Sequence, residues 1–384
     1  MMEVLLDVSL TGELALDEGQ IEIAKLFLSH EKTDVNQTNK DGKHCLYLAC
    51  ENGQIEIVKL LLNDKRVDVN KGDENNGETA FYIACEYGHI DIVKLLLSDK
   101  RIDVMKERTH GITPFYIACH NGDIEIVKLL LNDERVDVNK SDEDNTTPFF
   151  IACQNGHIEI VKLLLSDPRV DIRQAESERG LIPFWIACQQ GHVEIVELLL
   201  NLSDGRIDVN ENKNKNETTP FSSACQNGHI AIVRLLLNDS RVNINKVDKF
   251  GETPFYIACL YGQIEVVKIL LDNEKVDVKK ADYYDRTPFH TACHNAHFEI
   301  VKFILANGRD VDLNKKNIFG KSAIEIARDG IKQKKNFWEN EEKFKQRQRK
   351  FRKVVELLES FERNPNDVIT NLRIQLGLAG KNKF

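Results

Sequence analysis

Residues 113–119 read Thr-Pro-Phe-Tyr-Ile-Ala-Cys, and this phrase returns in slightly varied form every 34 to 37 residues along most of the chain. A fixed period of about 20–50 residues is typical of a solenoid, in which each repeat is one supersecondary unit stacked on the next. Two degraded units carry Leu16 and Arg328 in the last position of the phrase, which brings the count to about ten. Because stacked units form a long surface, the period favours a binding function. The cysteine that closes the phrase marks the eight clear units, at Cys50, Cys85, Cys119, Cys153, Cys188, Cys225, Cys259 and Cys293.

The composition is that of a chain with a continuous core and no membrane span. Apolar residues make up 42% of the 384 residues, and no apolar run reaches the roughly 18 residues that a spanning helix requires. Residues 1–8 carry acids where a signal peptide would carry positive charge, so we expect a cytoplasmic or nuclear location. The repeated cysteines lie on helices packed about 8–10 Å apart, farther than the roughly 4.4–6.8 Å between disulfide-linked Cα atoms. We therefore expect buried, reduced thiols.

The unit at 111–140 indicates two short helices joined by a tight turn. Thr113 is a favourable N-cap, and Pro114 suits the first helical position, where a missing N–H costs nothing. Gly122 allows the turn that ends the first helix. The second helix, Ile124 to Leu131, is apolar on two sides, with a polar connection leading to the next unit. Helices this short are stable only when stacked on neighbours.

These landmarks resemble the ankyrin repeat, whose Thr-Pro-Leu-His, Ala-Ala, Gly-His, Ile-Val, Leu-Leu-Leu and Asp-Val-Asn motifs recur here over roughly residues 10–330. Phe-Tyr replaces Leu-His in most units, and a longer Asn-Asp-Glu-Arg segment replaces the glycine that usually ends the second helix. The resemblance implies an all-α solenoid of about ten stacked repeats with hairpin fingers. It also implies partners bound along the concave face and the finger turns.

No sequence feature indicates catalysis, a cofactor or a metal. One histidine per unit occupies the turn between the helices (His89, His157, His192, His229 and His297), far from any shared ion, so we interpret it as structural. No nucleophile elbow, phosphate-binding loop or metalloprotease motif is present. The Asp-Val-Asn asparagines resemble those that asparaginyl hydroxylases modify in some ankyrin proteins, although a structural role in the turn is preferred. These asparagines are Asn36, Asn70, Asn139 and Asn210.

Large side chains concentrate on the variable positions of the last clear units. The finger pairs Lys249-Phe250 and Tyr283-Tyr284 and the turn pair Leu260-Tyr261 place aromatic residues where the family contacts its partners. Aromatic side chains are favoured anchors, because each buries much surface at little cost in rotamer entropy. The two tyrosines could instead cover the neighbouring finger. The candidate partner-binding residues are Phe250, Leu260, Tyr261, Tyr283, Tyr284, His294, Tyr87, His110 and His120.

Residues 332–353 have no place in the period and carry ten basic and three acidic residues. Their local charge of +7 contrasts with the net charge of −9 for the chain, so the remaining residues total −16. Phe337, Phe344, Phe351 and Leu358 are spaced by seven, which predicts an amphipathic helix from about 335 to 362. This helix could cap the solenoid. Alternatively, it could bind calmodulin-like proteins or an anionic membrane surface, with the solenoid as its carrier.

We therefore predict a monomeric, non-catalytic scaffold or adaptor that recognises protein partners; nucleic acid is disfavoured because the rest of the surface is acidic. The expected domains are a degenerate capping repeat at 1–37, eight repeats at 38–315, a degenerate repeat with its basic insertion at 316–363, and a short helix and tail at 364–384.

Overall fold

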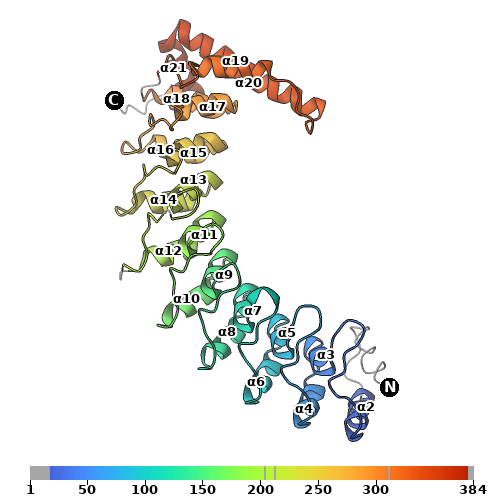
Figure 1. The fold of residues 1–384 in the computed structure, drawn as a ribbon. Coiled ribbons are helices and arrows are strands. Elements are labelled where there is room, and N and C mark those ends of the chain that lie inside the picture. The colour runs from blue at the N-terminus through green and yellow to red at the C-terminus, as the bar shows by residue number, and fades with distance from the viewer. Residues whose placement is uncertain (1–17, 203–204, 212, 310–311, 379–384) are drawn as a thin grey trace. The chain divides into compact units, whose positions relative to one another are not determined.

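A computed structural model describes residues 18–202, 205–211, 213–309 and 312–378 (Figure 1). Within these residues the chain is helical, and its extended pairing is limited to two isolated bridges, Thr38–His44 and Gly72–Thr79. The chain divides into two compact units, Met1–Pro183 and Phe184–Phe384. The first half of the degraded N-terminal repeat, with Leu16, and the tail expected at 381–384 lie outside the described residues.

The described part of the first unit, from residue 18 onward, contains one single helix followed by four helix pairs. The single helix, α2 (Glu18–Ser29), is the second helix of the degraded first repeat. A short 3-10 turn, η2 (Thr109–Gly111), lies in one of the fingers. The four pairs are α3 (Cys45–Glu51) with α4 (Ile55–Asn63), α5 (Ala80–Glu86) with α6 (Ile90–Ser98), α7 (Pro114–Asn121) with α8 (Ile124–Leu131), and α9 (Pro148–Asn155) with α10 (Ile158–Ser166).

The second unit continues the pattern and ends in three further helices, α19 (Ala323–Lys332), α20 (Glu341–Arg363) and α21 (Pro365–Gln375). The predicted helix over 335–362 is wrong at its start, because Asn340 caps α20 by accepting a hydrogen bond from the Lys343 N–H at 2.8 Å. Phe337 therefore lies before the helix. The pairs are α11 (Pro183–Gln190) with α12 (Val193–Leu200), α13 (Pro220–Asn227) with α14 (Ile230–Asn238), α15 (Pro254–Tyr261) with α16 (Ile264–Leu271), and α17 (Pro288–His294) with α18 (Phe298–Asn307).

The helix boundaries follow the local signals in the sequence. The Thr113 hydroxyl accepts a hydrogen bond from the Tyr116 N–H at 3.1 Å, and Pro114 is the first residue of α7. Gly122 ends this helix in the left-handed region, with φ 88°, while its N–H donates to the Ala118 carbonyl. The same threonine cap recurs at Thr79, Thr147, Thr219, Thr253 and Thr287.

The core lies between the stacked pairs of each unit. In α8, Ile126, Val127 and Leu130 are buried, whereas Glu125 and Lys128 form an ion pair of 2.6 Å on the outer side. The eight repeated cysteines are buried, and all nine cysteines are free thiols. Burial raises the pKa of these thiols, because a thiolate loses its hydration in the core. The all-α solenoid and the burial of the repeated cysteines are thus confirmed.

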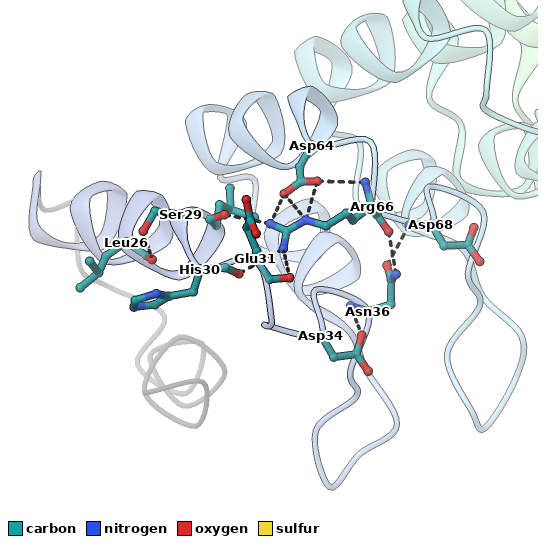
Figure 2. Close-up of polar contacts among 10 residues, drawn as sticks. Leu26, Ser29, His30, Glu31, Asp34, Asn36, Asp64, Arg66 and Asp68 are labelled. Atoms are coloured by element: carbon teal, nitrogen blue, oxygen red, sulfur yellow. Dashed lines mark hydrogen bonds and ion pairs between the residues drawn. The ribbon is translucent and has the colours of Figure 1, made fainter.

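The segment that replaces the usual glycine after the second helix carries an arginine that joins consecutive repeats (Figure 2). Arg66 donates to the carbonyl oxygens of Leu28, His30 and Glu31 in the preceding repeat, at 2.8–3.2 Å. Asp64 orients the guanidinium through a two-point contact, which holds the pKa of that carboxyl below its usual range. The carbonyls left unpaired at the end of one second helix are thereby capped by the next repeat. Equivalent arginines that reach a leucine carbonyl are Arg101, Arg135, Arg169, Arg241 and Arg309.

The Asp-Val-Asn asparagines form a second link between repeats, also drawn in Figure 2. The Asn36 amide donates to the Arg66 carbonyl at 2.8 Å, and its Oδ1 accepts from the Asp68 N–H at 2.8 Å. Each amide thus satisfies one donor and one acceptor of the next loop, which extends the turn role expected from the sequence. The same contacts recur at Asn70, Asn139 and Asn210.

Candidate protein-binding surface

The fingers are held in one conformation by buried acceptors at their base. The buried Asp248 carboxylate accepts from the N–H groups of Phe250 and Glu252, both at 2.9 Å. In the next finger, buried Asp282 accepts from the N–H groups of Tyr284 and Arg286, at 2.9 and 2.8 Å. These side-chain acceptors fix each turn together with a backbone hydrogen bond that closes it, from the Asp248 N–H to the Glu252 carbonyl at 3.2 Å and from the Asp282 N–H to the Arg286 carbonyl at 3.0 Å. The residues at the finger tips are therefore presented in a defined geometry.

Single hydrogen bonds join successive fingers of the second unit. The Tyr283 N–H donates to the Phe250 carbonyl at 3.0 Å, and the Ile318 N–H donates to the Tyr284 carbonyl at 3.1 Å. Asn317 fixes the third finger as the aspartates fix the others, by accepting from the Phe319 N–H at 3.0 Å. The tips of three consecutive repeats consequently lie side by side.

These tips expose a set of apolar side chains that we call the finger aromatic surface: Phe250, Tyr283, Tyr284, Ile318 and Phe319. Tyr283 is 71% exposed and Phe319 is 67% exposed, and the rings of Tyr284 and Phe319 stack with centroids 6.5 Å apart. Ile318 and Phe319 are absent from the residues predicted from the sequence, because they lie in the degraded repeat that follows the last clear unit. The signal was present, since the two residues precede Gly320 as Tyr283-Tyr284 precede Asp285.

A cation lies beside two of the rings in the finger aromatic surface. The Lys249 ammonium is 5.0 Å from the Phe250 ring centroid, and the Arg286 guanidinium is 5.0 Å from that of Tyr284. Such cation–π contacts orient the rings while leaving one side of each available. The Tyr283 ring also covers Gly251, where an added Cβ would come within 2.9 Å of the ring. Tyr283 therefore covers part of the neighbouring finger and still remains largely exposed.

A buried polar cluster supports Arg286 from below. Its Nε donates to Asp282 Oδ2 at 2.6 Å, and the same oxygen accepts from the Tyr256 hydroxyl at 3.0 Å. Glu252 lies 4.0 Å from the guanidinium. Burial, reinforced by the charge of Asp248, raises the pKa of Glu252 to about 7. The cluster fixes the guanidinium under the Tyr284 ring.

The other predicted partner-binding residues of the second unit lie at the ends of first helices. Tyr261 is exposed at the end of α15, and Leu260 is half-buried beside it. The Leu260 carbonyl accepts a hydrogen bond from His297 Nε2 at 3.1 Å, so its backbone belongs to the turn. His294 is exposed at the end of α17. The structure therefore brings Phe250, Tyr283 and Tyr284 together and places these three residues at helix ends.

The remaining three predicted residues belong to the first unit. Tyr87 is exposed and stacks on His89 with centroids 6.3 Å apart. His110 adopts a left-handed conformation at a finger tip, with φ 67°, and its Nδ1 lies 3.2 Å from Glu143 Oε2. His120 is exposed at the end of α7. Each of these residues is separately exposed, and they form no aromatic cluster like that of the second unit among the described contacts.

The turn histidines serve the stack, as the sequence predicted. The Nε2 atoms of His89 and His229 bond to carbonyl oxygens of the preceding repeat, those of Glu51 at 3.1 Å and Gln189 at 2.8 Å. His157 and His297 make the same contact. Across the described residues, no group of three or more His, Cys, Asp or Glu side chains could hold a metal ion. In the same residues, no helix combines the length and apolarity needed to cross a bilayer.

Repeated helix pairs linked by fingers place the protein in the class of helical repeat solenoids. A family model of three ankyrin repeats matches residues 13–108, 102–176, 168–248 and 240–317, so the chain belongs to the ankyrin-repeat family. A search of curated proteins finds no match to the chain. Ankyrin repeats generally mediate protein–protein interactions, and the family is typically non-catalytic.

Proposed function

We propose that this protein is a non-catalytic scaffold or adaptor that anchors a protein partner on the finger aromatic surface. The observation that carries the proposal is the exposure of five apolar side chains on three fingers whose backbones are fixed from below. Rigid, exposed aromatic residues gain contact area on binding without a large loss of conformational entropy. They are also the residue types that most often dominate the energy of protein interfaces.

The surrounding charge suggests which contacts the partner supplies. Lys249 and Arg286 flank the rings, and both are cations. A partner that buries Tyr284 and Phe319 can therefore place carboxylates at the edge of the contact, where rim charges speed association more than they strengthen binding. A cytoplasmic or nuclear monomer would present this surface without competition from a second copy.

The test begins with capture of partners from native lysate by the full-length chain, followed by purification of the retained protein. Its affinity is then measured for the wild type and for a Tyr284→Ala/Phe319→Ala variant. Loss of two anchor residues of about 2 kcal/mol each predicts a decrease in affinity of several hundredfold.

A matched control carries Asn75→Ala and Asn76→Ala, which alter a polar finger of the first unit. This variant should bind within about threefold of the wild type, as near-neutral interface positions do. Equal affinity of the wild type and the aromatic variant, with both folded by circular dichroism, would show that the finger aromatic surface is not the anchor.

A further inference from the structure

The basic segment, residues 332–353, is divided by the structure into a packed part and an exposed part. On α20, Phe351, Val354, Val355 and Leu358 are buried, and α20 packs chiefly against α19. The apolar side chains that a calmodulin-like protein would bind are therefore already buried where α20 caps the stack. What remains exposed lies before and along the first turns of α20, a stretch that Figure 1 shows extending away from the helix pairs of the second unit.

Two adjacent aromatic side chains form the end of this exposed part. Phe337 and Trp338 occupy the centre of a turn closed by a hydrogen bond of 3.1 Å from the Glu339 N–H to the Asn336 carbonyl. Phe337 is fully exposed, and Trp338 is 85% exposed. We call residues 336–339 the tip turn. Adjacent large aromatic residues facing water are costly for a soluble surface and mark a site of interaction.

Arg347 holds the tip turn in place. Its Nε and Nη2 donate to the two carboxylate oxygens of Glu339 at 3.0 and 2.9 Å, and Nη1 donates to Gln333 Oε1 at 2.9 Å. The guanidinium also reaches the Lys334 carbonyl at 3.2 Å. This two-point pair anchors the chain on either side of the aromatic residues to α20. The exposure of Phe337 and Trp338 is thus built into the turn.

The charges around the tip turn are overwhelmingly positive. Of the three acids in the segment, Glu339 is neutralised by Arg347, Glu341 pairs with Lys335 at 3.2 Å, and Glu342 accepts a hydrogen bond from the Gln346 amide at 3.3 Å. Six exposed cations of the segment make neither an ion pair nor a ring contact within the described part of the chain, whereas exposed Lys353 lies 5.9 Å from the Phe298 ring centroid. The six are Lys334, Lys343, Lys345, Arg349, Lys350 and Arg352.

We infer that the tip turn and these cations form a peripheral binding site for an anionic phospholipid surface. Tryptophan and phenylalanine partition to the interface between headgroups and acyl chains, and each nearby Lys or Arg adds about fivefold to the affinity for an anionic leaflet. A protruding turn needs only an interface to enter, whereas a protein acceptor would need a pocket shaped for two rings. Because the rest of the chain totals −16, repulsion would limit the contact to this segment. The site is independent of the finger aromatic surface.

The experiment uses the full-length chain with unilamellar vesicles of phosphatidylcholine alone or with about one third phosphatidylserine. Only two tryptophans are present, and the other, Trp185, is buried with its Nε1 donating to the Thr218 carbonyl. A blue shift of tryptophan emission on binding therefore reports insertion of Trp338. We expect binding and a blue shift with phosphatidylserine vesicles only.

Two variants separate the aromatic and electrostatic contributions. The affinity of every variant is measured by co-sedimentation with the vesicles, because the first variant lacks the Trp338 reporter. Phe337→Ser/Trp338→Ser should lower vesicle affinity at least about tenfold, and Lys343→Gln/Lys345→Gln/Arg349→Gln should lower it about a hundredfold. A control with the same loss of charge in the first unit, Lys32→Gln/Lys65→Gln/Lys100→Gln, should bind like the wild type.

Absence of binding to phosphatidylserine vesicles, or binding that neither variant weakens, overturns the proposal. Equal loss in the control variant also overturns it, because attraction would then depend on net charge alone. If vesicles fail to bind while a purified acidic protein binds in a salt-sensitive, Trp338-dependent manner, the surface belongs to a protein partner instead.

Discussion

Replacing Arg135 tests whether the arginine links described above stabilise the stack. Its Nη1 and Nη2 donate to the carbonyls of Ile102 and Leu97 in the preceding repeat, at 3.1 and 3.3 Å. Asp133 holds the guanidinium by two contacts of 3.0 and 2.6 Å. Each carbonyl bond contributes about 0.5–1.5 kcal/mol net, and the partly exposed ion pair adds at most a few tenths. Arg135→Ala should therefore lower the free energy of unfolding by about 1.5–2.5 kcal/mol.

Arg135→Lys distinguishes the fork-shaped guanidinium from its charge. Lysine keeps the positive charge but cannot reach both carbonyls and the carboxylate at once, so most of the loss should persist. The control is Lys128→Ala in the same repeat, because that residue makes only an exposed ion pair of 2.6 Å with Glu125. This control should cost less than about 0.5 kcal/mol.

The assay combines urea denaturation with hydrogen exchange resolved by peptide, because long repeat arrays need not unfold as one unit. Exchange should accelerate in α6 and α8, the helices on either side of the link. The reasoning is refuted if Arg135→Lys matches the wild type, or if Arg135→Ala costs no more than Lys128→Ala. Either result would mean that water, and not Arg135, satisfies the Ile102 and Leu97 carbonyls in the wild type.

Two further substitutions test the turns and the buried charge. Gly122→Ala should lower the free energy of unfolding by about 2–3 kcal/mol in thermal denaturation, because φ is 88° and the new Cβ would come within 2.7 Å of the His157 ring. The control Gly77→Ala, with φ 73° and open space around the new Cβ, should lower it by only about 1 kcal/mol. Equal losses in the two variants would show that the contact with His157 costs nothing. Glu252→Gln should raise the free energy of unfolding at pH 8 by about 3 kcal/mol, at about 1.4 kcal/mol for each unit by which the pKa is raised. The pKa of Glu252 is about 7 in the folded protein and 4.5 in the unfolded chain, so the wild type loses stability as the pH rises from about 4.5 to 7. If urea titrations show the same pH dependence of stability for Glu252→Gln and the wild type, the raised pKa of Glu252 is contradicted.

The repeat period predicted the fold because each core position is copied in every unit. Thr113, Pro114 and Gly122 act locally, through a cap, a fixed φ and a left-handed turn, and local effects can be read from a single segment. The partners of Arg66 could not be predicted in this way. They are backbone carbonyls 35–38 residues earlier in the chain, and a carbonyl leaves no mark in a sequence.

The candidate site was predictable in part for the same reason. Phe250, Tyr283 and Tyr284 were found because their finger positions recur, and Ile318 and Phe319 lie at those positions in the degraded repeat. The spacing of seven from Phe337 to Leu358 predicted one continuous helix. In the structure, Asn340 is the N-cap of α20, so the helix begins at Glu341 and Phe337 lies before it. The apolar spacing includes Phe337 although the cap at Asn340 leaves this residue outside the helix. Periodicity alone could therefore not reveal that Phe337 faces water.

The two exposed aromatic surfaces of the second unit differ in how strongly they depend on salt. On the fingers, Lys249 and Arg286 are engaged with the rings beside them, so binding there is driven by apolar area and should persist as ionic strength rises. Around the tip turn, six cations lack partners among the described residues, and attraction to an anionic leaflet decays over about 8 Å at physiological salt. Raising the salt should therefore release the chain from vesicles while a partner on the fingers stays bound. A scaffold built in this way could hold its protein partner continuously and its membrane contact conditionally, because only the latter contact depends on unscreened charge.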